Sequence, residues 1–243
     1  GGYKLFLDGS PQGRTAWMSE PYLGGDPGYC GYPIYSDREV IGLIDRAVGE
    51  GRQLLTHCNG DAASEQLLRC YKAVADRRGG AGDLRPGMVH CQMVRPDQLD
   101  RMPELGMIAS FFVVHTYYWG DVHIRNFGER RGRRISPMRS AIRGVVYTMH
   151  QDSPVVPPDM LLTIWAAVNR VSKNGTELAP EERISVWEAL RGVTVNAAYQ
   201  YHEEADKGTI EPGKLADLVI LERNPLLVPK QELKDIRVLE TVK

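Results

Sequence analysis

Residues 52–92, RQLLTHCNGDAASEQLLRCYKAVADRRGGAGDLRPGMVHCQ, hold the pattern that decides the fold. Residues 52–58 are a short strand-like run, and residues 63–80 are typical of a helix that ends at glycines. Residues 87–92 then return to a short apolar run. A strand, a helix and a second strand in this order predict a βαβ unit with parallel strands.

The same alternation extends from this unit toward both ends of the chain. Ser36 and Glu39 form a capping-box pair at the start of an earlier helix. Residues 115–132 are predicted to be a long polar loop. The pattern therefore predicts a parallel sheet of about five strands with crossover helices. The further strands are expected at 3–9, 107–114 and 145–150, and the further helices at 36–51, 95–105, 136–144, 158–171 and 180–201.

The last part of the chain has a different character. Residues 208–225 contain glycine turns and the short run DLVIL, and residues 236–242 form another apolar run. These segments predict a pair of strands outside the main sheet. Five parallel strands are too few to close a barrel of eight. We therefore expect the chain to be a piece of a larger protein.

Composition is that of an ordinary globular protein. The chain has 243 residues, of which 42% are hydrophobic and 25% charged, and its formal net charge is −1. This balance points to neither nucleic acid nor a membrane as a partner, and no apolar stretch approaches the ~20 residues that span a bilayer. One basic run exists, for which a solvated loop is favoured over a phosphate site. Its members are Arg130, Arg131, Arg133 and Arg134.

The cysteines and the first residues bear on location. Residues 1–4 are not the charged segment with a following apolar run that marks a signal peptide. The cysteines form no CxxC pair, and four of them in a chain this long imply no disulfide framework. We expect a cytoplasmic protein in a reducing compartment. The cysteines are Cys30, Cys58, Cys70 and Cys91.

Four polar residues lie in predicted strands or at their ends. Lys4 is in the first strand, His57 closes the second, His90 lies near the end of the third, and Asp152 follows the fifth. Functional groups of parallel α/β domains gather at the carboxyl ends of strands, because the loops there form the open mouth. Residues far apart in sequence are thus expected to converge.

The chemistry of this set favours a metal. Histidine nitrogens and carboxylate oxygens bind Zn²⁺ and similar divalent ions, and a metal lowers the pKa of a bound water to near neutrality. A single histidine at a strand end is more often a hydrogen-bonded core residue, but His57, His90 and Asp152 together favour a site. Strand alternation then turns Cys58 and Cys91 toward the helices, where they serve as packing residues.

Several segments resemble one family. "KLFLDGS…RTA", "THCNGDAA", "VHCQMVRPDQLDRMPELGMIAS", "DSPV" and "GTIEPGKLADLVIL" are similar, in order, to the amidohydrolase superfamily, and more narrowly to its amidohydrolase-3 (YtcJ-like) branch. The resemblance implies an incomplete TIM-type (β/α)8 metal-dependent hydrolase barrel, strands four to eight, over residues 1–205. It also implies that residues 206–243 are the C-terminal strands of a small β-sandwich.

The resemblance also implies roles for the four polar residues. Lys4 matches a lysine that is often carboxylated by CO2 and bridges two metals. His57 and His90 match ligands of the second metal, and Asp152 matches the ligand of the first metal that also shuttles a proton. The expected cofactor is one or two divalent metal ions, zinc first among them. Without the resemblance, a lysine snorkelling at a strand edge would be the preferred interpretation of Lys4.

Two departures from the family pattern matter. The family's first strand carries a His-x-His pair, which this sequence lacks, so the chain offers part of a binuclear site and is expected to have little activity alone. The family usually has a Gly-Ser pair before the aspartate, where this chain has His150 and Gln151. Strand alternation leaves two readings of His150: it reaches the mouth, or it fills space left by the smaller residue.

The sequence supports two functional hypotheses. The first is a metal-dependent hydrolase that cleaves a C–N bond, amide or cyclic amide, of a small molecule through a metal-activated water. The second is a non-catalytic remnant or regulatory protein that keeps the fold and binds a ligand or a partner, with a homo-oligomer among the possible assemblies. Asp61 is expected to cap the following helix or to anchor the loop of His57, the cap being favoured. Candidates for the substrate pocket are His115, Tyr117, Trp119 and His150.

Overall fold

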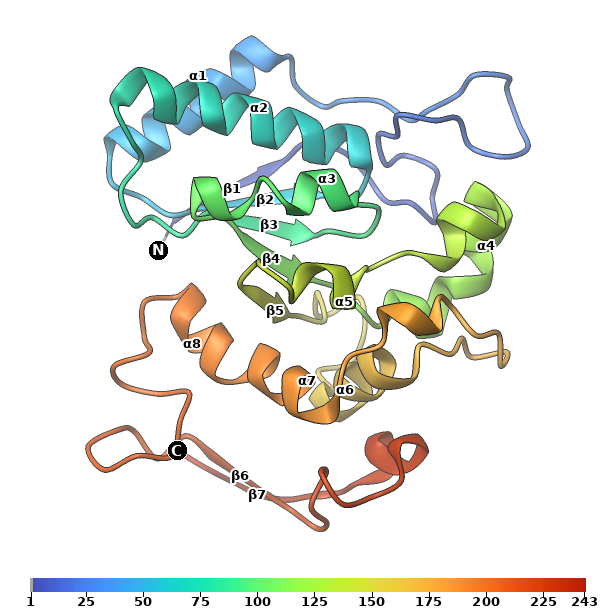
Figure 1. Ribbon diagram of the computed structural model, residues 1–243, viewed down its shortest axis with the longest axis vertical. Coiled ribbons are helices and arrows are strands. Elements are labelled where there is room, and N and C mark those ends of the chain that lie inside the picture. Colours follow the sequence, from blue (N-terminus) through green and yellow to red (C-terminus); the bar gives the residue numbers. More distant parts are fainter. Residues whose placement is uncertain (1) are drawn as a thin grey trace.

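The computed structural model describes residues 2–243 and contains a parallel sheet of five strands (Figure 1). Their spatial order β1-β2-β3-β4-β5 is the order of the chain, and every neighbouring pair is parallel. The predicted α/β class with about five parallel strands is confirmed. The strands are β1 (Tyr3–Phe6), β2 (Leu54–Cys58), β3 (Gly87–His90), β4 (Ile108–Phe111) and β5 (Tyr147–Met149).

The first crossover helices form where the sequence predicts them. Helix α1 (Asp37–Gly49) begins at Ser36, whose side chain accepts from the Glu39 amide in a complete capping box. Helix α2 (Asp61–Arg78) ends at Gly79, which adopts the left-handed conformation that glycine tolerates best. The predicted helix at 95–105 divides into α3 (Pro96–Leu99) and the 3₁₀ turn η1 (Pro103–Leu105), because Pro103 cannot continue the first helix.

One large correction concerns the predicted loop at 115–132. This segment is helix α4 (His115–Arg133), which changes direction at Gly128, where φ is +79°. The segment has no clear apolar stripe, since its buried side chains include histidine, threonine and asparagine. Periodicity in apolar residues could not reveal it, because tertiary contacts with polar and aromatic side chains bury one face.

The helices that follow β5 pack beside this edge strand, and the last of them reaches the amino end of β2. The predicted helix at 180–201 is interrupted, since Pro180 starts a 3₁₀ turn and Thr194 separates two helices. Gln53, which precedes β2, donates to the Gln200 carbonyl (2.6 Å) at the end of the last helix. The elements are α5 (Met138–Ala141), α6 (Met160–Asn169), η2 (Pro180–Glu182), α7 (Val186–Val193) and α8 (Val195–Gln200).

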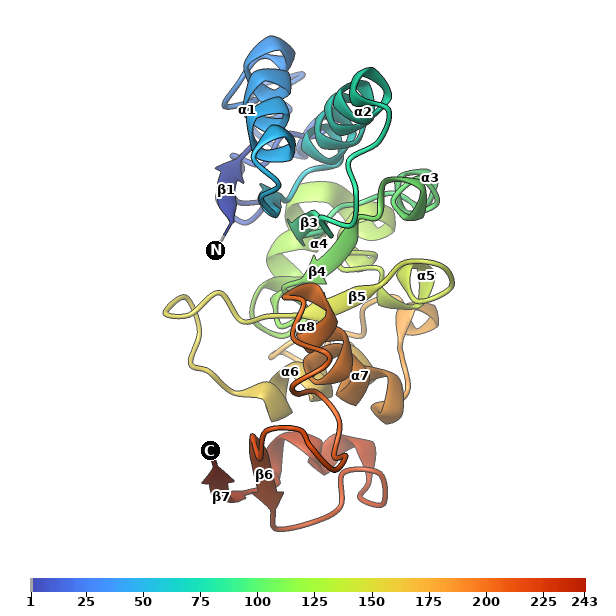
Figure 2. The same cartoon turned by 90° about the vertical axis from the view of Figure 1, so that its left-hand side faces the viewer.

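The main core lies between the sheet and its helices. Figure 2 shows α2, α3 and α5 along one side of the strands, whereas the segment between β5 and α6 extends to the other side. Cys58 and Cys91 are both fully buried in the helix-side core, which confirms their prediction as packing residues. Among residues 2–243, no helix has the length and apolarity that crossing a membrane requires.

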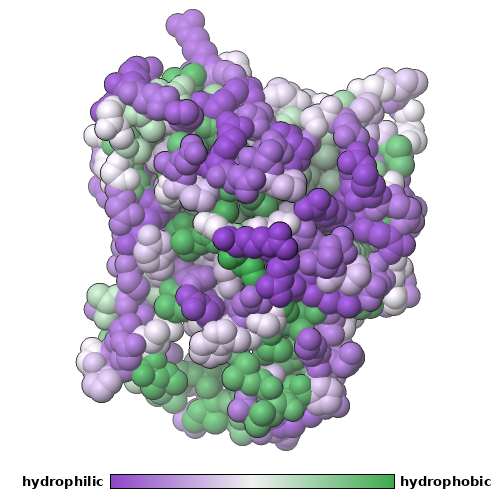
Figure 3. Space-filling view, viewed as in Figure 1, coloured by the Kyte–Doolittle hydropathy of each residue, from purple (hydrophilic) through white to green (hydrophobic). Residues whose placement is uncertain are grey.

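The C-terminal strands form a separate two-stranded sheet, as predicted. Strand β6 (Leu218–Leu221) pairs antiparallel with β7 (Val238–Val242). Val219, Ile220 and Leu239 are exposed there, and Figure 3 shows apolar side chains gathered over this lower part of the molecule. The intervening 3₁₀ turn η3 (Lys230–Asp235) packs against α6, where Trp165 donates to the Gln231 carbonyl (2.9 Å). The domain division at residue 205 stays a prediction.

Candidate functional site

Five of the six histidines lie in a row near the carboxyl ends of the strands. The rings of His57 and His90 are in edge contact with centroids 4.5 Å apart, and His90 and His150 follow at 5.0 Å. His115 and His123 stack at 5.4 Å, with Phe112 between His115 and His150. The sheet thus brings together the two predicted histidine ligands and His150.

Asp8, a buried carboxylate just after β1, lies beside the Nδ1 edge of the His57 ring. Asp8 Oδ1 lies 3.2 Å from His57 Nδ1, although the direction of this contact is not that of a hydrogen bond. The same carboxylate accepts from the backbone amides of Asn59 (3.0 Å), Gly60 (2.7 Å) and Trp17 (3.0 Å). Asp8 therefore ties the loops after β1 and β2 to the imidazole.

His90 reaches His57 through an unusual backbone turn. In the register of the sheet, His90 pairs with Cys58, whose side chain lies in the helix-side core. A regular strand would point His90 the same way. His90 and Cys91 instead have φ of +82° and +50°, a conformation that is uncommon for non-glycine residues and recurs at functional sites. Strand alternation correctly predicted that His57 and His90 lie together. It did not include the left-handed backbone turn that brings the His90 ring to that side of the sheet.

His150 links His90 to the sheet. Its Nε2 lies 3.2 Å from His90 Nδ1, and its Nδ1 lies 3.0 Å from the hydroxyl of Ser110 on β4. The Phe112 ring stacks on His150 with centroids 5.5 Å apart and planes at 25°. His150 therefore lies within the histidine row. The reading in which it only fills space away from His57 and His90 does not describe its place.

Burial lowers the pKa of four histidines of this row, His90, His115, His123 and His150, and holds them as neutral rings. Burial lowers the pKa of His90 well below its ordinary value, and the nearby His150 and His57 lower it further. Burial likewise lowers the pKa of His150 to about 3. Neutral imidazole is the form that binds a metal, because its second nitrogen keeps a lone pair. The pocket thus favours the protonation state that ligation requires.

Lys4 and Asp152 lie within electrostatic range of each other. Partial desolvation of the ammonium lowers the pKa of Lys4, and the charge of Asp152 acts in the opposite direction. Lys4 is exposed on the edge strand β1, with Nζ 5.5 Å from the centroid of the Phe6 ring. Asp152 is exposed in the turn after β5, at φ of +52°. The charge of Lys4 also acts on His90, so the four predicted residues share one region.

The candidate pocket residues divide into two groups. Trp119 is half-buried and packs on His115, with ring centroids 4.6 Å apart, so it belongs to the histidine row. Tyr117 instead meets Trp165 of α6, at 5.5 Å, away from the row. His115 is buried at the first residue of α4, beneath Phe112. Contact of these residues with a substrate stays a prediction.

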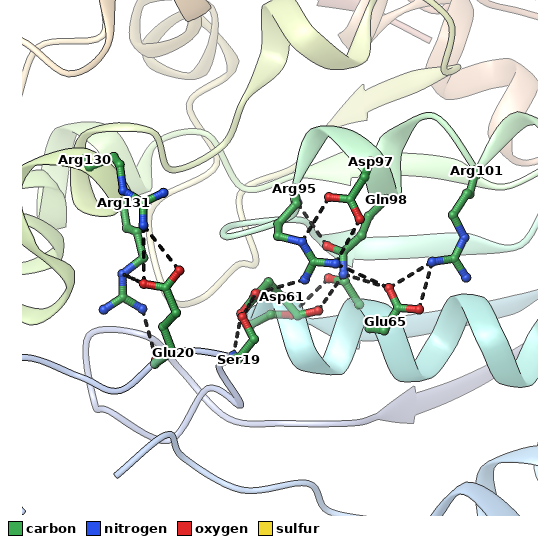
Figure 4. Close-up of polar contacts among 12 residues, drawn as sticks. Ser19, Glu20, Asp61, Glu65, Arg95, Asp97, Gln98, Arg101, Arg130 and Arg131 are labelled. Carbon is green, nitrogen blue, oxygen red and sulfur yellow. Dashed lines mark hydrogen bonds and ion pairs between the residues drawn. The ribbon is translucent and has the colours of Figure 1, made fainter. Parts of the chain in front are cut away.

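A network of charges fastens the rim of the site (Figure 4). Asp61 is the first residue of α2, where the cap position is Gly60, so the predicted side-chain cap is wrong. Its carboxylate accepts from the Ser19 amide (2.9 Å) and from Arg95 (3.0 Å), which joins the loops after β1 and β3. Arg131 donates to the Glu20 carbonyl (3.0 Å), so this member of the arginine run anchors a loop.

The donors among residues 2–243 can be compared with what a metal ion requires. The donor types fit, because the imidazole rings of His57 and His90 converge and a carboxylate lies beside His57. Within these described residues, however, no three histidine, cysteine, aspartate or glutamate side chains are grouped so that they could hold a metal ion. The residues therefore fit a metal as a portion of a larger ligand set.

Sequence reasoning missed the residues that support the histidines. Asp8 stands in the segment "FLDGS", which carries the family resemblance, but its position just after a strand was not used as a signal. Ser110 and Phe112 look like ordinary strand residues, and nothing in their pattern announces contact with His150. Arg170 looks like a helix-end arginine, yet it is fully buried.

Comparisons with known proteins point in one direction. A family described as "Amidohydrolase family" matches residues 1–243. The chain is similar to N-substituted formamide deformylase of Arthrobacter pascens (32% identity over 99% of this chain and 44% of that protein). It is also similar to the putative amidohydrolase YtcJ of Bacillus subtilis (28% identity over 100% of this chain and 46% of that protein).

A solved structure agrees with the sequence relatives. An uncharacterized metal-dependent hydrolase from Pyrococcus horikoshii superposes with a TM-score of 0.81 at 29% identity, covering 94% of this chain and 46% of that one. The chain thus spans about half the length of the curated relatives that it matches.

Proposed function

The chain belongs to the amidohydrolase family, and on this premise we propose that the protein is a metal-dependent hydrolase that cleaves a C–N bond, amide or cyclic amide, of a small molecule. The observation that carries the proposal is the contact between the rings of His57 and His90 at the carboxyl ends of neighbouring strands, where burial keeps His90 neutral. Two imidazoles that meet in this way are a costly arrangement unless they bind something, because the nitrogens of the buried His90 ring must find partners other than bulk water.

The proposal includes a finer fold. Strands β1–β5 would be strands four to eight of a (β/α)8 barrel, and β6–β7 would be part of a small β-sandwich, with a division between residues 205 and 206. The parallel order of β1–β5 supports this. In such a barrel, catalytic groups lie at the carboxyl ends of the strands, which is where the histidine row stands.

In this proposal His57 and His90 hold a metal, and further ligands complete the set, because residues 2–243 contain no group of three histidine, cysteine, aspartate or glutamate side chains that could hold one. When bound, a divalent metal such as zinc lowers the pKa of a water molecule and polarises the carbonyl of the substrate. The carboxylate of Asp8 lies on the Nδ1 side of the His57 ring, and Asn59 Nδ2 lies 3.2 Å from Nε2 on the other side, so a metal at Nε2 would replace Asn59 as the partner of that nitrogen. His90 Nδ1 lies 3.2 Å from His150 Nε2.

Lys4 is proposed to be carboxylated on Nζ and to act as a bridging ligand. An ammonium has no lone pair, so it cannot bind a metal or react with CO2. The lowered pKa of Lys4 favours the free amine that carboxylation needs. The carbamate would present two oxygens next to the histidine row.

Asp152 is proposed to move the proton. Its exposed carboxylate stands in the turn after β5, where a substrate would enter. It takes a proton from the attacking water and gives it to the nitrogen that leaves, so that the amine departs neutral. Asp152 lies close enough to Lys4 for its charge to raise the pKa of the Lys4 ammonium. Carboxylation of Lys4 would remove this attraction between opposite charges.

A second function is favoured by one observation. Because the described residues contain no complete metal-binding group, the protein could instead bind a ligand or partner without catalysis, on the same fold. Metal content separates the two, since the hydrolase requires it and the binding protein does not.

The test uses the full-length protein. We expect purified protein to contain one or two divalent metal ions per chain by mass spectrometry, and to hydrolyse members of a panel of N-substituted formamides and cyclic amides. Asp152→Asn should lose at least about 100-fold in kcat, the lower range for a general base, and should weaken binding of the first metal, of which Asp152 is the expected ligand. His57→Ala should lose metal. His202→Ala, an exposed histidine outside the row, is the matched control.

Two results would contradict the proposal. Metal-free protein from a metal-supplemented preparation would favour the binding function. Hydrolysis that is unchanged in Asp152→Asn would remove the proton-transfer role.

A further inference from the structure

His150 stands where it can set the hydrogen on His90. Its two ring nitrogens are both engaged, Nδ1 with the Ser110 hydroxyl at 3.0 Å and Nε2 with His90 Nδ1 at 3.2 Å. The ring is also clamped by stacking on Phe112. The three side chains therefore form a line that runs from β4, through the residue after β5, to the end of β3.

The line allows two proton arrangements with opposite consequences. If His150 donates from Nδ1 to Ser110, its Nε2 accepts from His90 Nδ1–H, and His90 Nε2 keeps a lone pair. If Ser110 donates instead, His150 Nε2–H points at His90 Nδ1, and the His90 hydrogen must sit on Nε2. Only the first arrangement leaves Nε2 of His90 free to bind a metal.

We propose that His150 is a positioning residue that fixes the His90 ring with its hydrogen on Nδ1 and so presents His90 Nε2 as a metal ligand. The inference rests on the proposed function for the metal, but its effect on the His90 hydrogen exists without one. The His150 ring is restrained by its contacts with Ser110, His90 and Phe112. Its burial keeps it neutral.

The backbone of His90 explains why such a partner is needed. At φ of +82° the residue lies outside the ordinary strand conformation, and its ring is turned away from the register that the sheet would impose. The ring meets His57 of the neighbouring strand at its edge, a contact that does not select which nitrogen carries the hydrogen. The hydrogen bond that His90 Nδ1 donates to His150 Nε2 in the first arrangement supplies this selection and restrains rotation about χ2.

Three variants of the full-length protein separate positioning from packing. His150→Phe keeps an aromatic ring on Phe112 but removes the hydrogen bond to His90. His150→Gln restores an acceptor, because the Gln amide reaches about as far as Nε2. His123→Phe is the matched control, since His123 is buried in the same row but contacts His115 rather than His90.

The first measurement needs no metal. Nitrogen-15 NMR of histidine-labelled metal-free protein reports which ring nitrogen carries hydrogen. We expect His90 to be the Nδ1–H form in the wild type, in His150→Gln and in His123→Phe, and to shift to the Nε2–H form in His150→Phe. An unchanged His90 spectrum in His150→Phe would overturn the inference, whatever the protein does with metals.

The second measurement is zinc affinity, by competition with a chelator. We expect a loss of about 10- to 100-fold in His150→Phe, the usual cost of an outer partner of a ligand, with affinity near wild type in His150→Gln and His123→Phe. Wild-type zinc affinity in His150→Phe would contradict the inference. A wild-type protein that binds no zinc, but shows the expected NMR shift, would contradict only the proposed function.

Folding of the variants is checked first by thermal unfolding. If His150→Phe does not fold, Ser110→Ala takes its place, because it removes the far partner of His150 without touching His90. We then expect a mixture of the two His90 forms. A single Nδ1–H form in Ser110→Ala would show that the line does not set the hydrogen, and would overturn the inference.

Discussion

Asp8 and Arg170 are buried charges of opposite sign, and each holds loops through backbone groups. The Asp8 carboxylate accepts from amides, whereas the Arg170 guanidinium donates to carbonyls. Asp8 gathers three backbone amides and lies against His57. The Arg170 guanidinium donates to the carbonyls of Leu178, Ser136, Arg133 and Ile135. None of these hydrogen bonds within residues 2–243 involves a histidine. The comparison teaches that two equally buried charges can have different roles. Asp8 contacts a proposed metal ligand directly, whereas Arg170 stabilises only the loops around the site.

A chain of hydrogen bonds connects the segment held by Arg170 to the histidine row. Ser136, whose carbonyl Arg170 holds, donates its hydroxyl to Gln92 (2.9 Å), and Gln92 donates to the Phe112 carbonyl (2.9 Å). Phe112 is the ring that stacks on His150. Asp8 is thus one contact from a proposed ligand, whereas Arg170 is several contacts away.

The largest effect is expected for Arg170→Met. It removes the guanidinium donor from four carbonyls, of which the Ser136 carbonyl keeps the Met138 amide as a donor. Each unmade hydrogen bond costs about 1–3 kcal/mol, so we expect the free energy of unfolding to fall by about 4 kcal/mol after partial relaxation. Urea unfolding of the full-length protein measures this. Because Arg170 does not touch the histidines, zinc affinity should stay within about threefold of wild type where the variant is folded. A large loss of affinity would erase the contrast with Asp8.

Asp8→Asn should give a smaller loss of stability with a loss of metal. The amide keeps one acceptor oxygen, but its NH2 group faces amides that the second carboxylate oxygen had accepted, so we expect about 3 kcal/mol. The His57 ring also loses its anionic neighbour, and zinc affinity should fall about tenfold or more. Stability and affinity are measured on the same preparation. If Asp8→Asn behaves like Arg170→Met, the direct and indirect roles are not distinct.

Much of this arrangement was open to sequence reasoning. The βαβ rhythm predicted the parallel sheet, and the position of His57 and His90 at strand ends predicted their convergence. The positive φ of His90 could not be foreseen, because no glycine marks it. Arg170 and Asp8 were missed for the same reason: burial of a charge depends on which backbone groups surround it, and those come from distant parts of the chain.

The helix α4 shows a second limit of sequence reasoning. Its buried residues are two histidines, an asparagine, a threonine and two glycines, with Phe127 the one large apolar side chain among them, so no apolar stripe signals it. Periodicity detects helices that bury hydrocarbon. A helix that buries polar side chains against one another is recognised only when the partners, such as His115 and His123 at 3.1 Å, are in place.

His123 provides a third buried group, one without a charged partner. Burial lowers the pKa of His123 to about 3, and its Nδ1 has no hydrogen-bond partner within residues 2–243. Below the ordinary pKa of about 6.5, the unfolded chain takes up a proton that the folded chain refuses. Stability from this group is therefore complete above pH 6.5 and is lost as pH falls toward 3.

His123→Phe should reduce this loss. At pH 5.0 the wild type has lost about 2 kcal/mol through this group, at about 1.4 kcal/mol per pH unit. We expect the difference in unfolding free energy between pH 7.5 and pH 5.0 to shrink by that amount in the variant, while His202→Ala, at an exposed histidine, leaves it unchanged. An identical acid loss in His123→Phe would mean that His123 is not held neutral.

The smallest effect is expected at an exposed cap, far from either buried charge. The Ser36 hydroxyl accepts from the Glu39 amide at 3.4 Å, and the Glu39 carboxylate accepts from the Ser36 amide at 2.8 Å. Water replaces such a partner easily, so Ser36→Ala should cost about 1 kcal/mol. Ser185→Ala, in the equivalent box of α7, is the matched control and should cost about the same. Both variants should keep wild-type zinc affinity. A loss near that of Asp8→Asn would mean that exposure does not separate these polar groups, and that burial is the wrong basis for the comparison between Asp8 and Arg170.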